Sequence, residues 1–303
     1  MKIDIYPPLY LHEIGFRENQ EDALWPNEAG VESRLFILCD GMGGHEHGEV
    51  ASQTVCQSIG KWYQEHLNAE DVLSDNKLRE AIEFAYTELD KYADDNPRQM
   101  GTTLTLLYFG SKGITAAHMG DSRIYHIRPE AGVLYQSRDH SLVFDLFQAG
   151  EITYEQMSTY PQKNMVTRAM MPGEDNRMRP DIIHITDIQP DDYFYMCSDG
   201  MMEKMTNEDL MSILSADMED KMKVGQLKMA TNQNFDNHTA WIIHIKNAIK
   251  EENDDQFENE ERTSRINAIN ILPHPVYDAE DNDVVVVGSK EKSLFQKIIG
   301  IFK

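Results

Sequence analysis

The stretch that most constrains the fold of this chain is Phe36–Gly44, which reads Phe-Ile-Leu-Cys-Asp-Gly-Met-Gly-Gly. The unbroken apolar run Leu35–Cys39 has the length of a strand that a sheet buries on both faces. Asp40 follows at once, and a carboxylate at the end of a buried strand is costly unless a positive group meets it. The glycines that follow would let backbone carbonyls and a phosphate approach closely. Two interpretations stay open at this point, a cation site and an ordinary Asp-Gly turn.

The composition excludes several classes of protein. The 303 residues are 41% apolar, enough for one large domain or two ordinary ones. The formal net charge of −24 would repel nucleic acid, whereas it suits a site that gathers divalent cations. Cys39, Cys56 and Cys197 show no disulfide or metal spacing, so we expect buried structural thiols. Neither a signal-peptide pattern nor a run of transmembrane length is present in the sequence, which predicts a cytoplasmic location.

The apolar periodicity predicts both helices and strands. Helical spacing indicates helices over 49–67, 76–92 and 219–230, a short one near 142–147, and another that starts at the capping-box sequence of Thr206. Short β-rich runs at 101–109, 114–119, 122–128 and 133–136 predict one antiparallel meander with Asp121 in a turn. Further strands are expected at 182–186, 193–197 and 239–245. Residues 140–180 interrupt this pattern, and we interpret them as an excursion from the sheet that could act as a lid.

Four aspartates, far apart in the chain, each fall beside an expected strand end: Asp22, Asp40, Asp199 and Asp236. Their repeated position suggests carboxylates that converge at one edge of stacked sheets. Oxygen ligands favour hard cations such as Mg²⁺ or Mn²⁺. Arg17 and Glu21 lie just before Asp22, so this segment is either a charged surface loop or an arginine that grips an anion beside metal-holding acids.

These residues resemble a known family, the metal-dependent protein phosphatases of the PP2C (PPM) type, and the Asp-Gly-Met-Gly-Gly form resembles its bacterial branch. The resemblance covers about residues 10–246. It rests on motifs that occur in the family's order: Arg17-Glu-Asn-Gln-Glu21-Asp22, Asp40-Gly-Met-Gly-Gly44, Gly101-Thr-Thr103, Gly120-Asp-Ser-Arg123, Ser198-Asp-Gly200 and Asp236-Asn237. It implies an α+β fold, a four-layer α-β-β-α sandwich of two stacked antiparallel sheets flanked by helices. It also implies a flap at about 140–180, where Pro161–Asn164 and Thr167–Ala169 match the bacterial flap sequence.

The resemblance also implies a role for each matching residue. Asp40 would bridge two Mn²⁺ or Mg²⁺ ions, and the carbonyl of Gly41 would be a further ligand. Asp199 and Asp236 would complete one metal's shell. Asp22 and Glu21 would hold water ligands, with Asn237 in support. Asp121 and Asp199 would hold a third, weaker ion, and Arg17 would clamp the substrate phosphate.

The implied activity is hydrolysis of phosphoserine or phosphothreonine by a hydroxide that bridges the two metals, without a phosphoenzyme. The leaving oxygen needs a proton, and animal members of the family carry a histidine where this chain has Met42. Metal-bound water is our first candidate for the acid. His45 and His47 are alternatives, and otherwise they are part of an exposed loop that enters a helix.

Alternative functions and the C-terminal region stay open. A site with another phosphorylated substrate is one alternative. A catalytically silent module that binds phosphoproteins or regulates a partner is another. A nucleotide-binding loop is excluded because no Gly-Lys-Ser/Thr follows the glycines. We expect residues 1–247 to form the phosphatase domain and 248–303 an acidic flexible linker with a C-terminal amphipathic segment, which would dock on a protein surface or bind weakly to an anionic membrane.

Overall fold

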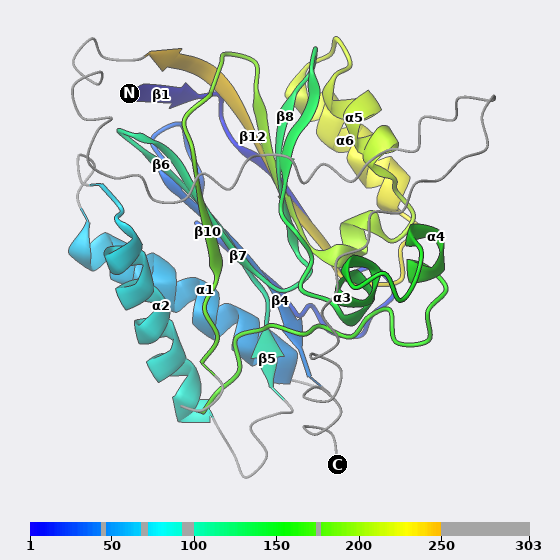
Figure 1. The fold of residues 1–303 in the computed structure, drawn as a ribbon. Helices are drawn as coiled ribbons and strands as arrows, with labels where there is room; N and C mark the ends of the chain where they lie inside the picture. The colour runs from blue at the N-terminus through cyan, green and yellow to red at the C-terminus, as the bar shows by residue number, and fades with distance from the viewer. Residues whose placement is uncertain (44–46, 68–71, 93–99, 174–176, 250–303) are drawn as a thin grey trace, which may run out of the picture. The chain divides into compact units, whose positions relative to one another are not determined.

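The computed structural model describes residues 1–43, 47–67, 72–92, 100–173 and 177–249. The chain divides into two units, Met1–Ile271 and Leu272–Lys303, and the second lies wholly outside the described residues. Of the predicted acidic linker and amphipathic segment, 248–303, the first two residues belong to the strand β12, His238–Ile249, and the rest lie outside the described residues. Within the first unit, two antiparallel sheets stack on each other between two pairs of helices (Figure 1). This arrangement confirms the predicted α+β sandwich.

The first sheet runs in the order β1-β12-β11-β8-β9, and β2 also pairs with β12. Its strands are β1 Lys2–Ile5, β2 Leu9–Glu13, β8 Arg123–Arg128, β9 Gly132–Gln136, β11 Tyr193–Cys197 and β12 His238–Ile249. The predicted strands among these are confirmed, and β12 is longer than expected. The strands β1 and β2 are not among the predicted ones, because runs of only four and five residues are too short for their alternation to stand out.

The second sheet runs in the order β10-β7-β6-β4-β3, with β5 paired to β4. Its strands are β3 Asp22–Trp25, β4 Leu35–Met42, β5 Gly101–Thr102, β6 Leu104–Gly110, β7 Gly113–Met119 and β10 Asp181–Ile185. The predicted run 101–109 is thus two strands. Strand β4 continues through Asp40 to Met42, so the Asp-Gly sequence is part of a strand and does not form a turn. The turn interpretation of that sequence is wrong.

The apolar run at the start of β4 is unbroken because both of its faces are covered. Leu35, Ile37 and Cys39 belong to a core shared with the helices α1 His47–His66 and α2 Asp75–Leu89. Phe36 and Leu38 belong to a second core, which lies between the two sheets. Side chains alternate across a strand, so a strand with two buried faces needs an apolar residue at every position.

The helices α5 Asn207–Leu214 and α6 Asp220–Thr231 cover the outer face of the first sheet, where a third core forms (Figure 1). The predicted capping box at the start of α5 is confirmed: the backbone N–H of Asp209 donates to the hydroxyl of Thr206, and the carboxylate of Asp209 accepts from the backbone of Thr206. A single turn of 3-10 helix, Asp90–Tyr92, follows α2, and another, Asp199–Met202, follows β11. The three cysteines are free and buried, as predicted.

The predicted single meander over 101–136 is wrong. The chain forms one hairpin, β6-β7, in the second sheet and another, β8-β9, in the first. Between them, residues 120–122 carry the chain from one sheet to the other. Local β-propensity cannot reveal this crossing, because it reports that a strand exists and not which sheet the strand joins. The crossing matters for function because it carries Asp121.

The excursion expected at about 140–180 lies between β9 and β10, where the structure describes residues 137–173 and 177–180, and we call it the flap. It contains α3 Leu142–Gln148, as predicted, and a short helix that was not predicted, α4 Tyr154–Met157. Within the described part of the chain, no helix has the length and apolarity needed to cross a membrane.

Two helical glycines allow a matched test of the packing of α1 against β3. A Cβ on Gly60 of α1 would lie 2.4 Å from the Trp25 ring, whereas a Cβ on Gly225 of α6 would meet nothing within 4 Å. We predict that Gly60→Ala lowers the free energy of unfolding by about 1–3 kcal/mol through overpacking. Gly225→Ala should raise it by about 0.5–1 kcal/mol. Urea unfolding of both variants checks this, and equal effects in the two variants would contradict the packing described here.

Candidate metal and phosphate site

The predicted carboxylates gather where strands of the two sheets end. Asp22 on β3 is the direct partner of Asp40 on β4 in the antiparallel register. In the other sheet, Asp199 follows the end of β11, and Asp236 precedes the start of β12. These two strands are neighbours, and Cys197 pairs with Ala240. The sheet topology therefore brings together acids that are more than 200 residues apart in the chain.

Ser198 links the two sheets at this point. Its hydroxyl donates to Asp22 Oδ2 at 2.9 Å and accepts from the backbone N–H of Thr239 at 3.0 Å. Asp22 is 3% exposed, and its other oxygen, Oδ1, has no hydrogen bond of good geometry among the described residues, although the Thr239 side chain lies close enough to lower the pKa of this carboxyl. A buried carboxylate oxygen without a partner is costly unless a cation or an ordered water meets it. Ser198 had no predicted role of its own, and its place in the Ser-Asp-Gly motif was the one sign in the sequence that it belongs to the site.

Two threonines hold the backbone around Asp40. The N–H of Asp40 donates to Thr103 Oγ1 at 2.9 Å, and the carbonyl of Asp40 accepts from the N–H of Thr103 and from Thr102 Oγ1, both at 2.9 Å. Thr103 Oγ1 also lies 2.7 Å from Ser122 Oγ, beside Asp121. The Gly-Thr-Thr motif thus connects Asp40 to the crossing between the sheets. Sequence reasoning assigned these threonines no role.

Gly41 is fixed by close backbone packing. Its N–H donates to the carbonyl of Glu21 at 3.0 Å, and a Cβ at this position would lie 2.1 Å from the carbonyl oxygen of Gly48. Any side chain here would therefore displace the start of α1. Gly41 follows Asp40 on β4, which is the position expected of a residue whose carbonyl binds the same cation as Asp40.

Asn237 positions the loop that carries Arg17 and Glu21. Its Nδ2 donates to the carbonyls of Ile14 and Asn19, at 2.8 and 3.0 Å, and its Oδ1 accepts from the N–H of Glu21 at 2.8 Å. These three bonds hold the loop over residues 14–21 against the start of β12. Asn237 thus holds this loop in place, and its predicted support of the metal ligands stays a prediction.

Arg17 lies at the mouth of the acidic group. Its Nη2 donates to Asp236 Oδ2 at 2.8 Å, and its guanidinium carbon lies 5.5 Å from the centre of the Phe235 ring. The hydrogen bond that Arg17 donates to Asp236 raises the pKa of Arg17, so the guanidinium stays charged. Its side chain is 46% exposed, which leaves donors free to meet an anion from solvent.

The acids hold an excess of negative charge in poorly solvated surroundings. Burial raises the pKa of Asp22 to about 7, and it raises the pKa of Asp40 well above its usual range, with further contributions from Asp22, Asp199, Asp121 and Asp236. Loss of solvation and the charge of Asp236 raise the pKa of Asp199 to about 6, although part of its side chain reaches solvent. Burial also raises the pKa of Glu21. Such a group of carboxylates favours a bound cation.

Asp121 lies on the crossing between the sheets, on the side of Asp199. Burial and the charge of Asp199 raise its pKa to about 8. The nearby Asp139 does not add an unpaired charge, because Arg123 donates to both of its oxygens at 2.8 and 2.7 Å. Because Asp139 is paired with Arg123, Asp121 stays available to bind a cation together with Asp199.

A different group is the most compact cluster of possible metal ligands in the described part of the chain: His118, His140 and Asp181 have ligand atoms within 4.8 Å of one another. Their hydrogen bonds argue against a metal. The N–H of Gly120 donates to His140 Nδ1 at 3.1 Å, so Nε2 carries the proton and donates to Asp181 Oδ2 at 3.1 Å. A metal on Nε2 would move that proton to Nδ1, against the N–H of Gly120.

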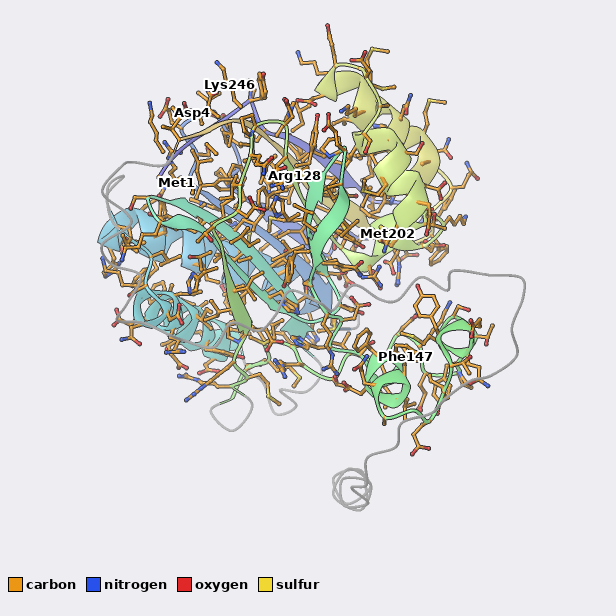
Figure 2. The ribbon with its side chains drawn as sticks, turned by 45° about the horizontal axis from the view of Figure 1, so that its top comes forward. Met1, Asp4, Arg128, Phe147, Met202 and Lys246 are labelled. Atoms are coloured by element: carbon orange, nitrogen blue, oxygen red, sulfur yellow. The ribbon has the colours of Figure 1, made fainter. Side chains whose placement is uncertain are left out.

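This second cluster anchors the flap. His118 Nε2 donates to the carbonyl of Arg138 at 2.8 Å, the N–H of Thr167 donates to the carbonyl of His140 at 2.8 Å, and Arg168 donates to Asp181 at 2.6 Å. Both ends of the flap are thereby tied to the second sheet. In Figure 2, Phe147 of α3 marks the flap, to one side of the sheets. The predicted flap residues Thr167–Ala169 lie at its base, beside these contacts.

Of the two histidines considered as proton donors near the glycines, the structure describes one. Met42 ends β4 and offers no proton. His47 is the first residue of α1 and is partly exposed, whereas His45 lies outside the described residues.

Comparison with known proteins identifies the family. The family model described as "Protein phosphatase 2C" matches residues 17–262, more than half of the chain. The chain belongs to the protein phosphatase 2C family. Protein phosphatase PhpP of Streptococcus pneumoniae is 31% identical over 240 residues, which cover 76% of this chain and 93% of the relative. The serine/threonine phosphatase stp of Listeria monocytogenes is 30% identical over 235 residues, which cover 75% and 90%.

Solved structures of the family share the fold. Stp1 of Staphylococcus aureus matches with a TM-score of 0.68 and 30% identity, covering 79% of this chain and 94% of that one. The catalytic domain of PstP in complex with two manganese ions matches with a TM-score of 0.67 and 26% identity, covering 81% and 100%. The predicted family and the predicted enzyme class, a metal-dependent phosphoprotein phosphatase of bacterial type, are confirmed. All these relatives are named as phosphatases, which gives no support to the catalytically silent alternative.

The raised pKa of Asp22 predicts that stability depends on pH when a chelator keeps the site free of metal. A carboxyl with a folded-state pKa of about 7 keeps a proton that the unfolded chain loses near pH 4, so stability falls as the pH rises from about 4 to 7 and then levels off. Between pH 5.5 and 7.5 the free energy of unfolding should fall by about 2 kcal/mol through Asp22. Urea unfolding in EDTA at both pH values checks this. The variant Asp22→Asn should show a smaller fall, and an identical fall would contradict the assignment.

Proposed function

We propose that the protein hydrolyses phosphoserine and phosphothreonine in protein substrates, and that the reaction takes place at the cluster of aspartates beside Arg17. The observation that carries this proposal is the buried oxygen Oδ1 of Asp22, which has no hydrogen bond of good geometry. Asp22 pairs with Asp40 across the two strands, and among the described residues Arg17 is the cation that forms an ion pair with this group of acids. A group of this kind is suited to divalent cations, and the arginine is suited to a phosphate.

The residues present fit two hard divalent cations, Mn²⁺ or Mg²⁺, since all the candidate ligands are oxygens. Asp40 would contact both ions, with the Gly41 carbonyl, Asp199 and Asp236 as further ligands and with Asp22 holding ligand water. Glu21 would support this water, and Asp121 with Asp199 would hold a third ion. Such cations supply the Lewis acidity that makes a bound water nucleophilic at neutral pH, the hydroxide of the predicted mechanism.

Arg17 binds and orients the phosphate group. A guanidinium has five N–H donors, so Arg17 can keep a hydrogen bond to Asp236 while other donors meet phosphate oxygens. Charge develops on these oxygens as the ester bond breaks, and a fixed positive group beside them stabilises it. Asn237 keeps Arg17 in place through its three bonds to the loop before β3.

The departing serine or threonine oxygen requires a proton. Met42 has none to give, and water at the site is our first candidate for the donor. His47 is the described alternative. A cytoplasmic location, a serine/threonine kinase that phosphorylates the substrate, and docking of the C-terminal segment on a partner or weakly on a membrane stay predictions.

Turnover of a phosphothreonine peptide tests this function. We expect hydrolysis in Mn²⁺ that EDTA abolishes, and a fall in kcat/KM on the order of 100-fold or more in Asp199→Asn, because a lost ligand weakens both metal binding and chemistry. The matched control is Asp217→Asn, an exposed aspartate beyond α5, which should retain wild-type turnover. Turnover that survives both EDTA and Asp199→Asn would contradict the proposed site.

A further inference from the structure

Two phenylalanines beside the candidate site are unusually exposed. Phe16 is 60% exposed and Phe235 is 57% exposed, and Ile14 on the same loop as Phe16 is 43% exposed. Single exposed apolar residues are ordinary on protein surfaces. Here, however, they come from two segments that are 200 residues apart in the sequence and adjacent in space.

The two segments are held tightly against each other. The N–H of Phe16 donates to the carbonyl of Phe235 at 2.9 Å. Gly15 has a φ of +63°, and a Cβ there would lie 2.3 Å from the carbonyl oxygen of Asp236. The backbone N–H groups of Phe235 and Asp236 both donate to Glu203 Oε2, at 2.7 and 3.2 Å. The phenylalanines thus stand on a backbone that is fixed before any ligand binds.

The two phenylalanines adjoin the residue proposed to bind phosphate. Arg17 follows Phe16 in the chain, its guanidinium carbon lies 5.5 Å from the centre of the Phe235 ring, and it forms an ion pair with Asp236 at 2.8 Å. A phosphorylated side chain that reaches Arg17 would bring its neighbouring residues to the two phenylalanines.

We propose that Phe16 and Phe235 form an apolar rim that binds a large apolar side chain next to the phosphorylated residue, so that preferred substrates carry Leu, Ile, Phe or Met within two residues of the phosphate. This inference rests on the proposed function and names the substrate class for the same site. The occupant is a substrate segment, because the rim adjoins the guanidinium that binds the phosphate. A preorganised apolar surface binds with little loss of conformational entropy.

The rim has a defined kinetic signature. It contacts residues that take no part in the reaction, so it binds substrate and transition state equally well. Loss of such an interaction raises KM and leaves kcat unchanged. Loss of phosphate binding by Arg17 would lower kcat as well.

The test compares two phosphothreonine peptides in the full-length protein with Mn²⁺: one with leucines on both sides of the phosphothreonine and one with glycines there. We expect wild type to favour the leucine peptide by about tenfold in kcat/KM, a value typical of partial burial of one apolar side chain. Phe16→Ala and Phe235→Ala should each reduce this preference severalfold through KM. Phe235→Leu, which keeps an apolar side chain, should retain most of it.

The matched control is Met222→Ala, which removes a side chain 58% exposed on α6, and it should keep the full preference. Equal turnover of the two peptides by wild type, or an unchanged preference in both alanine variants, would overturn the rim. A preference that varies with protein concentration would also overturn it, in favour of a second copy as the occupant. If wild type hydrolyses neither peptide, the proposed function fails instead.

Discussion

The facing pair of Asp22 and Asp40 is the constraint on which the rest of the site depends. Their strands are hydrogen-bonded neighbours, so the two carboxylates cannot separate without breaking the edge of the second sheet. Burial holds the pKa of each above its usual range, and the charge of Asp22 raises that of Asp40 further. The hydrogen bond from Ser198 meets one oxygen of Asp22 and extends the constraint to the first sheet. We expect a cation bound between these carboxylates to remove the repulsion.

The fold concentrates acids at this place through its connections. β11 and β12 bring Asp199 and Asp236 to the same end of the first sheet, and the crossing between the sheets adds Asp121. The positive charge in contact with them comes from Arg17, held by a loop that Asn237 fixes. The flap leaves from β9 and returns to β10, with both of its ends anchored around His140, so its base adjoins the crossing that carries Asp121.

Much of this was predictable, because the predicted features have local signals. The unbroken run before Asp40 indicated a strand covered on both faces, and the cores on its two sides explain why every position is apolar. The motif order identified the family, and it also predicted the site residues, whose roles stay predictions. The predictions that failed depend on contacts between residues far apart in the chain. The change of sheet at Asp121 depends on pairing partners far away in the chain, and the bridging roles of Ser198 and Thr103 depend on contacts that no spacing reveals. The flap anchor of His118, His140 and Asp181 was missed for the same reason.

Anomalous diffraction at the manganese edge, from crystals soaked in Mn²⁺, tests the central claim most directly. The account predicts anomalous density beside the Asp40 carboxylate, within reach of Asp199 and Asp236 and on the side of Asp22 Oδ1. It predicts none at His118, His140 and Asp181, where hydrogen bonds fix the proton on His140 Nε2. Density at the histidine cluster, with none beside Asp40 at saturating Mn²⁺, would contradict the assignment of the metal site.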